Sequence, residues 1–562
     1  MKISGAEIVI KSLLHEGAET IFGYPGGAIM PVYDALYEYM DQLQHILVRH
    51  EQGAVHAAQG YSRASGKVGV CMATSGPGAT NLITGIADAM IDSTPLVCIT
   101  GQVPAHLLGT DAFQETDVVD ISMPVTKWNY QVTSPEDIAP AIAKAFYIAR
   151  SGRPGPVLVD ITKNAQVGLA EYIPQSEPML RSYHPHPKCD ENQIEQTLEL
   201  IDRADKPLIL LGQGVSISGA EKEFVEFVEK SGIPFAATLM GLSAASTSHP
   251  KYVGMLGMHG NYAPNVMTNE ADLIIAIGMR FDDRVTGDVN RYAVNAKVIH
   301  IDIDKSEFNK NIPTDVCVHA DAKEALQRLN AKVQFSDYSS WLKAFHDGLE
   351  KEKHELKVHD ISPDAPYPLT MKEVIMKLSQ LTEGKAVVVT DVGQHQMVTA
   401  RYYDFQDTRT NITSGGLGTM GFALPAAIGA KLSVPEKTVV MVAGDGSFQM
   451  NIQELGTIMQ NGIDVKILVL NNHFLGMVRQ WQQLFYEKRY SFTEIDSPDF
   501  IMLAKSYGIS GKSITQPEDL EAALQEMLEH KGSYLLEVKV AKEDNVFPMV
   551  PAGASVSEIR LK

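Results

Sequence analysis

The chain has 562 residues, a hydrophobic fraction of 44% and a formal net charge of −20 at pH 7. This length predicts about three to four domains, and the hydrophobic fraction is ordinary for a globular protein with several cores. The negative charge argues against nucleic acid or an anionic membrane surface as a partner, so anionic substrates must be attracted by local cations.

The four cysteines, Cys71, Cys98, Cys189 and Cys317, are scattered and form no C-x-x-C pair. Cys71 and Cys98 lie in apolar runs, which indicates reduced core thiols and not disulfide partners or metal ligands. No apolar run reaches about eighteen residues, and the N-terminus shows neither a signal peptide nor a transit segment. We expect a cytoplasmic protein with no membrane partner.

The first part of the chain alternates predicted helices and short buried strands, as in a parallel α/β domain. A helix is predicted at 5–14, and strands are predicted at 47–49, 67–73, 95–100 and 157–161. Glu51 follows the strand at 47–49 and opens a helical segment rich in small residues. Taken alone, Glu51 is most simply a first-turn carboxylate that the helix dipole favours.

A second α/β domain follows a proline-rich stretch that reads as a linker. A helix is predicted at 191–204, and strands at 207–211, 273–277 and 298–303 end in glycine-bearing loops that suit a nucleotide. The Gly212-Gln213-Gly214 turn is by itself a weak dinucleotide signal. His184 and His186 alternate with prolines, and linker polarity explains them better than metal binding.

Two apolar runs in the third domain end in residues that suit a cation. The run at 438–443 ends at Gly444-Asp445-Gly446, and the run at 465–470 ends at Asn471-Asn472. Since ligands bind beyond the carboxyl ends of parallel strands, we expect Asp445 and Asn472 side by side. A carboxylate, an amide oxygen and a nearby main-chain carbonyl suit Mg²⁺, and the glycines admit phosphates. The alternative is two unrelated strand-end turns.

These motifs together resemble one family, the catalytic subunits of acetohydroxyacid synthase (acetolactate synthase). The resemblance covers nearly the whole chain, and its most particular motifs are R-F-D-D-R-V-T-G at 280–287 and G-M-V-R-Q-W at 476–481. It also includes Y-P-G-G-A at 24–28, R-H-E-Q-G-A at 49–54 and A-T-S-G-P-G-A-T-N at 73–81.

The resemblance implies an α/β fold with three doubly wound parallel-sheet domains. These are a pyrimidine-binding domain at 1–165, a central Rossmann-like FAD-binding domain at 191–345, and a domain at 369–545 that binds pyrophosphate and Mg²⁺. Linkers are expected at 166–190 and 346–368, and a C-terminal tail at 546–562.

The resemblance assigns Glu51 to activation of thiamine diphosphate (ThDP), with Gly27, Phe113, Gln114 and Lys163 as further catalytic residues. The metal ligands would be Asp445, Asn472 and the main-chain oxygen of Phe474. Met420 would support the bent cofactor, although without the family it reads as a core methionine. The positions implied for ThDP contact are Glu51, Gln394, His395, Gly418, Thr419, Met420, Asp445, Gly446, Ser447, Asn472 and Met477.

A second set of positions matches FAD contacts in the family. They are Ser93, Arg153, Gly212, Thr238, Leu239, Met240, Gly241, Leu256, Gly257, Met258, His259, Gly278, Met279, Arg280, Phe281, Asp282, Asp302, Ile303, Asp321, Ala322, Gly415 and Gly416. Arg284, Trp481 and Met258 match the pocket for the second substrate, and an ion pair with Asp282 or Asp283 is the alternative for Arg284. Thr162-Lys163-Asn164 departs from the family's Pro-Lys-Asp, so Lys163 lacks the acidic neighbour that the family commonly has.

The implied activity is decarboxylation of pyruvate and ligation to a second 2-keto acid, the first common step of branched-chain amino acid biosynthesis. Pyruvate would give 2-acetolactate, and 2-oxobutyrate would give 2-aceto-2-hydroxybutyrate. The resemblance implies ThDP, Mg²⁺ and FAD, a homodimer or homotetramer with active sites between subunits, and a possible regulatory small subunit. The alternatives are pyruvate oxidase, a FAD-independent catabolic acetolactate synthase, and a catalytically silent flavoprotein or regulatory binding module.

Overall fold

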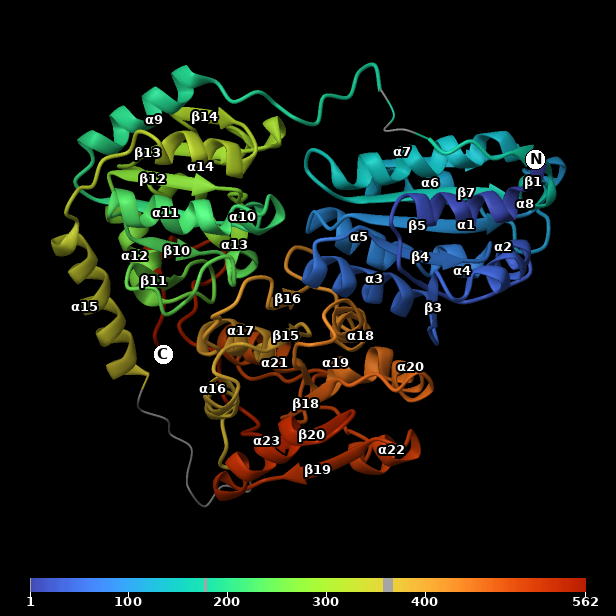
Figure 1. The fold of residues 1–562 in the computed structure, drawn as a ribbon. Coiled ribbons are helices and arrows are strands. Elements are labelled where there is room, and N and C mark those ends of the chain that lie inside the picture. Colours follow the sequence, from blue (N-terminus) through green and yellow to red (C-terminus); the bar gives the residue numbers. More distant parts are fainter. Residues whose placement is uncertain (1, 176–177, 179, 357–366) are drawn as a thin grey trace.

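The computed structural model describes residues 2–175, 178, 180–356 and 367–562. These residues form three six-stranded sheets, one after another along the chain, each with helices packed against it (Figure 1). Every strand pair within the three sheets is parallel. The predicted fold class, α/β with three doubly wound parallel sheets, is confirmed.

The first sheet has the order β3-β2-β4-β5-β7-β6. Its main covering helices are α1 (Gly5–His15), α3 (Glu51–Ser65), α5 (Ile83–Ile91) and α7 (Ile138–Arg150). The strands are β2 (Thr20–Gly23), β3 (Gln44–Leu47), β4 (Gly69–Ala73), β5 (Leu96–Gln102), β6 (Trp128–Val132) and β7 (Pro156–Thr162).

The strand predicted at 47–49 is misplaced. Strand β3 ends at Leu47, because pairing with β2 in the register Thr20↔Gln44 to Gly23↔Leu47 decides where it lies. Arg49 lies beyond the strand and donates to the backbone oxygen of Leu47. The polar residues that begin β3 hid it from a search for apolar runs. Cys71 and Cys98 are free, buried thiols on the paired strands β4 and β5, as predicted.

The central sheet has the order β11-β10-β9-β12-β13-β14. Its helices include α9 (Glu191–Arg203), α11 (Glu221–Ser231) and α14 (Ala322–Asn330). The strands are β9 (Pro207–Leu211), β10 (Phe235–Ala237), β11 (Tyr252–Met255), β12 (Leu273–Ile277), β13 (Lys297–Asp302) and β14 (Val316–His319). The predicted helix and the three predicted strands of this domain are confirmed to within one residue at each end.

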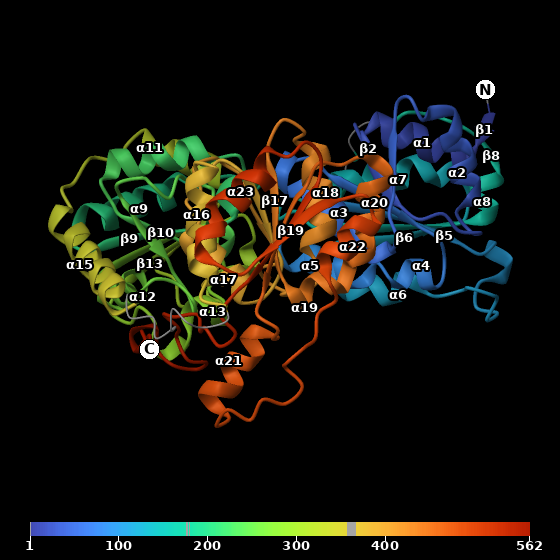
Figure 2. The ribbon, with the colours of Figure 1, turned by 90° about the horizontal axis from the view of Figure 1, so that it is seen from below.

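The third sheet has the order β16-β15-β17-β18-β20-β19. The helices that concern the site are α17 (Gln394–Tyr402), α18 (Ala423–Ser433) and α21 (Gly476–Phe485), and Figure 2 shows α21 projecting from the domain. The strands are β15 (Val387–Thr390), β16 (Asn411–Thr413), β17 (Val439–Gly444), β18 (Lys466–Asn471), β19 (Ser510–Ile514) and β20 (Tyr534–Lys539). β17 and β18 are neighbours with Gly444 opposite Leu470, so Asp445 and Asn472 leave adjacent strand ends as predicted.

The connecting segments carry more structure than their composition predicted. Strand β8 (Leu169–Glu171) lies in the expected linker at 166–190 and pairs antiparallel with β1 (Lys2–Ser4). Helix α15 (Ser339–Glu355) extends into the expected linker at 346–368, of which residues 357–366 lie outside the described residues. The tail returns to the central domain through an antiparallel bridge between Gly287 and Ser555. Within the described ranges, no helix has the length and apolar character needed to span a membrane.

Candidate functional site

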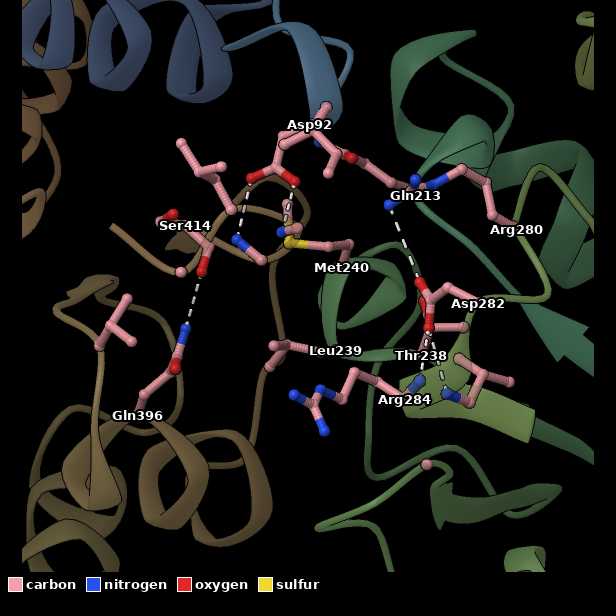
Figure 3. A pocket seen from close by; sticks show the side chains of 18 of the residues that line it. Asp92, Gln213, Thr238, Leu239, Met240, Arg280, Asp282, Arg284, Gln396 and Ser414 are labelled. Atoms are coloured by element: carbon pink, nitrogen blue, oxygen red, sulfur yellow. Dashed lines mark hydrogen bonds and ion pairs between the residues drawn. The ribbon is translucent and has the colours of Figure 1, made fainter. Parts of the chain in front are cut away.

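A cavity of about 870 Å³ lies where glycine-rich strand ends of the central and third domains face each other. Ser93 and Arg153 of the first domain also line it. Figure 3 shows side chains of all three domains pointing into this space. A cavity of this size is near the upper end of the usual range for ligand pockets, so it can hold a large cofactor.

Asp445 lies behind the third-domain end of the cavity, between the lining residues Gly444 and Gly446, at the first position of α19 (Asp445–Phe448). The hydroxyl of Ser497 donates to Asp445 Oδ2 at 3.0 Å, whereas Oδ1 is buried without a hydrogen-bond partner among the described residues. Burial raises the pKa of Asp445 to about 6, and the hydrogen bond from Ser497 opposes this shift. A buried carboxylate oxygen without a partner is costly unless a cation or donor satisfies it.

Asn472 follows β18 and its amide is held in one orientation. Its Nδ2 donates to Gln394 Oε1 at 3.1 Å, and its Oδ1 accepts from the backbone amide of Phe474 at 3.2 Å. Gln394 in turn donates to Gln480 at 3.0 Å. The amide oxygen of Asn472 therefore keeps a lone pair available for a cation.

The amide and main-chain oxygens matter here because the described residues contain no cluster of three or more His, Cys, Asp or Glu side chains that could hold a metal. A cation beside Asp445 would need neutral oxygens and oxygens from its ligand to complete its shell. Mg²⁺ commonly binds in this way, with few carboxylates and several phosphate or water oxygens.

Glycines in three loops allow backbone to border the cavity closely. Gly418 has a φ of +70°, which favours glycine, and a Cβ on Gly476 would lie 2.2 Å from Gln394 Oε1. His395 also lines the cavity, and burial lowers its pKa to about 3, so its ring is neutral. The positions predicted for ThDP that line the cavity are Gln394, His395, Gly418, Met420, Gly446, Ser447, Asn472 and Met477.

Two predicted ThDP positions of the third domain, Thr419 and Asp445, are buried behind the lining. Three predicted FAD positions, Gly212, Gly241 and Phe281, also do not line the cavity. A Cβ on Gly212 would lie 2.1 Å from the backbone oxygen of Gly278, so this glycine allows two loops to pack together. Gly241 has the same function against Leu211, and the buried Phe281 ring packs edge-on against His300.

The remaining FAD positions line the central-domain part of the cavity. They are Ser93, Arg153, Thr238, Leu239, Met240, Leu256, Gly257, Met258, His259, Gly278, Met279, Arg280, Asp282, Asp302, Ile303, Asp321, Ala322, Gly415 and Gly416. Burial raises the pKa of Asp302 to about 7. Arg153 is held by Glu307 at 2.9 Å, Asp304 at 3.2 Å and Ser93 at 2.9 Å.

Arg284 reaches into the cavity from α13 (Asp283–Thr286) (Figure 3). Asp282 caps this helix by accepting from the backbone amides of Arg284 and Val285. The nearest carboxylate to the Arg284 guanidinium is that of Asp283 at 3.8 Å, and both side chains are more than half exposed. Such a pair is weak, so Arg284 remains free to bind an anion. Trp481 of α21 and Met258 line the same cavity.

Glu51, Gly27, Phe113, Gln114 and Lys163 are not among the residues that line this cavity. They lie at the carboxyl edge of the first sheet, around the glycine turns at 26–27 and 76–78. Glu51 Oε2 accepts from Asn81 Nδ2 at 2.9 Å, and Lys163 Nζ donates to the backbone oxygen of Gly27 at 3.4 Å. Phe113 is 88% exposed. The predicted site residues therefore form two separate groups within one chain.

Several residues of the cavity were missed by sequence reasoning. His186, attributed to linker polarity, lines the cavity. Asp92 accepts from the backbone amides of Gly415 at 2.9 Å and Gly416 at 2.7 Å (Figure 3). Only its position beside Ser93 could have suggested it, because its partners are more than 300 residues away. Other missed lining residues include Glu307, Gln396 and Ser414, whereas Gln213 and Gly214 belong to the turn that gave a weak dinucleotide signal.

Comparison with known proteins agrees with this arrangement. The chain matches family models described as the thiamine pyrophosphate enzyme N-terminal TPP binding domain over residues 3–121, the central domain over 194–329 and the C-terminal TPP binding domain over 391–538. The class is therefore a thiamine pyrophosphate enzyme.

Relatives with the same arrangement are acetolactate synthase subunits. The chain is 48% identical to the acetolactate synthase isozyme 2 large subunit of Escherichia coli, with 99% of each chain covered. It is 46% identical to the acetolactate synthase large subunits of Lactococcus lactis (99% of this chain, 96% of the relative) and Haemophilus influenzae (100% and 98%). The chain belongs to the family of acetolactate synthase large subunits, and the predicted resemblance is confirmed.

Proposed function

We propose that this enzyme forms acetolactate from pyruvate, or the corresponding aceto-hydroxy acid from pyruvate and 2-oxobutyrate, in the site described above. The observation that carries the assignment is that Asp445 and Asn472 follow the ends of two neighbouring strands. One oxygen of the buried Asp445 carboxylate, Oδ1, has no hydrogen-bond partner among the described residues and is available to a cation. ThDP, when bound, supplies a ring that accepts the electron pair released as a 2-keto acid loses CO₂. The chain is 46–48% identical in sequence to acetolactate synthase large subunits over nearly their full length, which favours this activity over that of a pyruvate oxidase.

We assign Mg²⁺ to Asp445 Oδ1, Asn472 Oδ1 and the main-chain oxygen of Phe474. The support is the unpartnered carboxylate oxygen and the amide fixed by Gln394. A divalent cation beside Asp445 would favour the ionised carboxylate and lower its raised pKa. Gly444, Gly446 and Gly476 line the cavity beside these ligands, so diphosphate oxygens next to the ion would face backbone there.

We assign FAD to the central-domain part of the cavity. Loops at the ends of β9, β10, β12 and β13 meet there, and glycines let their backbones approach a ligand. Arg153 is held in place by two carboxylates and a hydroxyl and presents its charge at the wall. The net reaction transfers no electrons, which fits a flavin that supports the site.

We assign the carboxylate of the second keto acid to Arg284. Its guanidinium is weakly paired and points into the cavity, and this group can bind a carboxylate through two parallel hydrogen bonds. Trp481 and Met258 offer apolar surface for the keto acid's side chain. Holding the second keto acid in this position favours ligation over protonation, because its reacting carbon is kept close.

The Glu51 group belongs, we propose, to the active site of a second copy of this chain in a homodimer or homotetramer. In one chain it lies apart from the cavity, and the nearby Phe113 is largely exposed. Phe492, which follows α21, is 97% exposed and is also available for such an interface. We further propose that the protein is cytoplasmic and binds a separate small subunit. We place the domain boundaries at residues 165, 190, 345, 368 and 545.

Omission of each cofactor tests the activity. Purified protein should form acetolactate from pyruvate with ThDP, Mg²⁺ and FAD present, and the rate should fall when any one is withheld. Titration calorimetry should show ThDP binding that requires Mg²⁺. Protein that binds neither ThDP nor Mg²⁺ would refute the proposal.

Mixing two inactive variants tests the shared site. In a heterodimer of Glu51→Gln and Asp445→Ala chains, one site carries both defects and the other carries neither. Co-expression should therefore restore about a quarter of the parental activity if the partner supplies Glu51. If both residues act within one chain, the mixture stays inactive.

A further inference from the structure

The loop from Ser414 to Gly421 receives hydrogen bonds from two carboxylates of the first domain. Asp92, directly after α5, accepts from the backbone amides of Gly415 and Gly416 (Figure 3). Asp88, on α5, accepts from the hydroxyls of Ser414 and Thr419, the latter at 2.9 Å. Both carboxylates are buried, with Asp92 at 3% and Asp88 at 0% exposure. A buried charge with several donors fixes the geometry of those donors firmly.

Arg63 at the end of α3 lies between these two acids. Its Nη2 lies 3.0 Å from Asp92 and 3.8 Å from Asp88, and its Nη1 donates to the backbone oxygen of Thr413 at 2.5 Å. Burial raises the pKa of Asp92, and the charge on Arg63 and the two glycine amides counteract this. The cluster therefore links two helices of the first domain to the start of the loop.

Among the described residues, the hydrogen bonds that the rest of the third domain makes to this loop lie at its two ends. Gln396 donates to Thr413 Oγ1 at 2.7 Å and to the Ser414 backbone oxygen at 3.0 Å. Asp391 accepts from the backbone amides of Gly421 and Ala423, each at 2.9 Å. Gly415, Gly416 and Thr419, between these ends, receive the first-domain contacts. Gly418 and Met420, which line the cavity, lie in the same segment.

We propose that Asp88 and Asp92, with Arg63 between them, are positioning residues that hold the loop of Ser414 to Met420 in the conformation that binds ThDP. The inference rests on the proposed function, because Gly418 and Met420 affect the reaction only if ThDP binds against them. None of the three charged residues needs to touch the reacting atoms. Each acts through the loop backbone and the hydroxyls of Ser414 and Thr419.

Asp92→Asn tests this inference, because an amide keeps the shape of the side chain but has one oxygen to accept from two glycine amides. ThDP affinity would be measured by titration with Mg²⁺ present, together with the near-UV circular dichroism of the bound cofactor. We expect the Kd for ThDP to rise at least about tenfold, which corresponds to the loss of one hydrogen bond to a charged group. A loss of stability alone would lower the fraction of protein that binds, but not the affinity of the folded fraction.

Asp272→Asn is a matched control. The Asp272 carboxylate also accepts from two consecutive backbone amides, those of Asp205 at 2.8 Å and Lys206 at 2.9 Å. Asp272 directly precedes β12, at the amino ends of the central strands, whereas the cavity lies at their carboxyl ends. It should leave the Kd for ThDP unchanged. If Asp92→Asn does not fold, Ser414→Ala decides, because it removes a donor to Asp88 and an acceptor for the Thr419 amide without changing any charge.

Parental ThDP affinity in both Asp92→Asn and Ser414→Ala would overturn the inference while leaving the proposed function intact. A parent protein that binds no ThDP would instead remove the proposed function, and the inference with it. Weaker ThDP binding by both variants, with the Asp272→Asn control unchanged, supports the positioning function.

Discussion

Replacing Gly60 with alanine should push apart two helices that pack the first domain against the third. Helices α3 and α18 lie side by side with their backbones in contact (Figures 1 and 2). A Cβ on Gly60 would lie 1.9 Å from the backbone oxygen of Ala426, which is 1.5 Å short of the 3.4 Å where ordinary contact begins. Because the clash is with backbone, no change of side-chain rotamer can relieve it.

The expected cost follows from this geometry. Overpacking a well-packed contact costs about 1–3 kcal/mol, and a backbone clash belongs at the upper end of that range. The better helix propensity of alanine returns up to about 1 kcal/mol, which leaves a net loss of about 2 kcal/mol. The shift also reaches the site, since α3 begins with Glu51 and α18 follows Met420. A displacement of catalytic groups by about 1 Å lowers activity by about 10²-fold, and we expect a loss of this order.

Thermal unfolding and initial rates would measure both effects, and two companion variants make the result specific. A Cβ on Gly85 meets a side-chain atom, Val55 Cγ1, at 1.9 Å, so Val55→Ala should rescue Gly85→Ala. Ala426→Gly should not rescue Gly60→Ala, because the clashing oxygen remains. Parental stability and rate in Gly60→Ala, or its rescue by Ala426→Gly, would refute the reasoning.

Three further substitutions address the chemistry. Glu51→Gln should lower turnover at least about 10²-fold with little change in folding or FAD content, and near-normal rates would rule out its catalytic role. Trp481→Leu should change the preference between 2-oxobutyrate and pyruvate, measured by product ratio, more than the decarboxylation of pyruvate; equal losses would contradict the pocket assignment. Burial raises the pKa of Asp302 to about 7, so folding stability should fall as pH rises from about 4 through 7, where the unfolded carboxyl is ionised and the folded one is not. Unfolding of flavin-free Asp302→Asn across this pH window should show a smaller loss than the parent, and identical pH profiles would show that Asp302 is not responsible.

Local residue patterns determined much of this protein's fold. Apolar runs such as those of β9 and β12 form buried parallel strands wherever they lie, so the α/β class could be predicted from them. The glycines, Asp445 and Asn472 could be placed at strand ends because each follows its run directly. The motifs then identified the family, although the polar strand β3 and the pairing of β8 with β1 were not visible in composition.

Only the tertiary structure decided which strand ends meet and what surrounds them. It brought Asp92 and Asp88 to a glycine loop more than 300 residues away, and it placed Glu51 apart from the cavity of its own chain. Local sequence encodes where a strand begins and ends, because neighbouring residues set backbone preference and burial. Contacts between distant segments depend on how the three sheets pack together, and no single stretch of the chain records that packing.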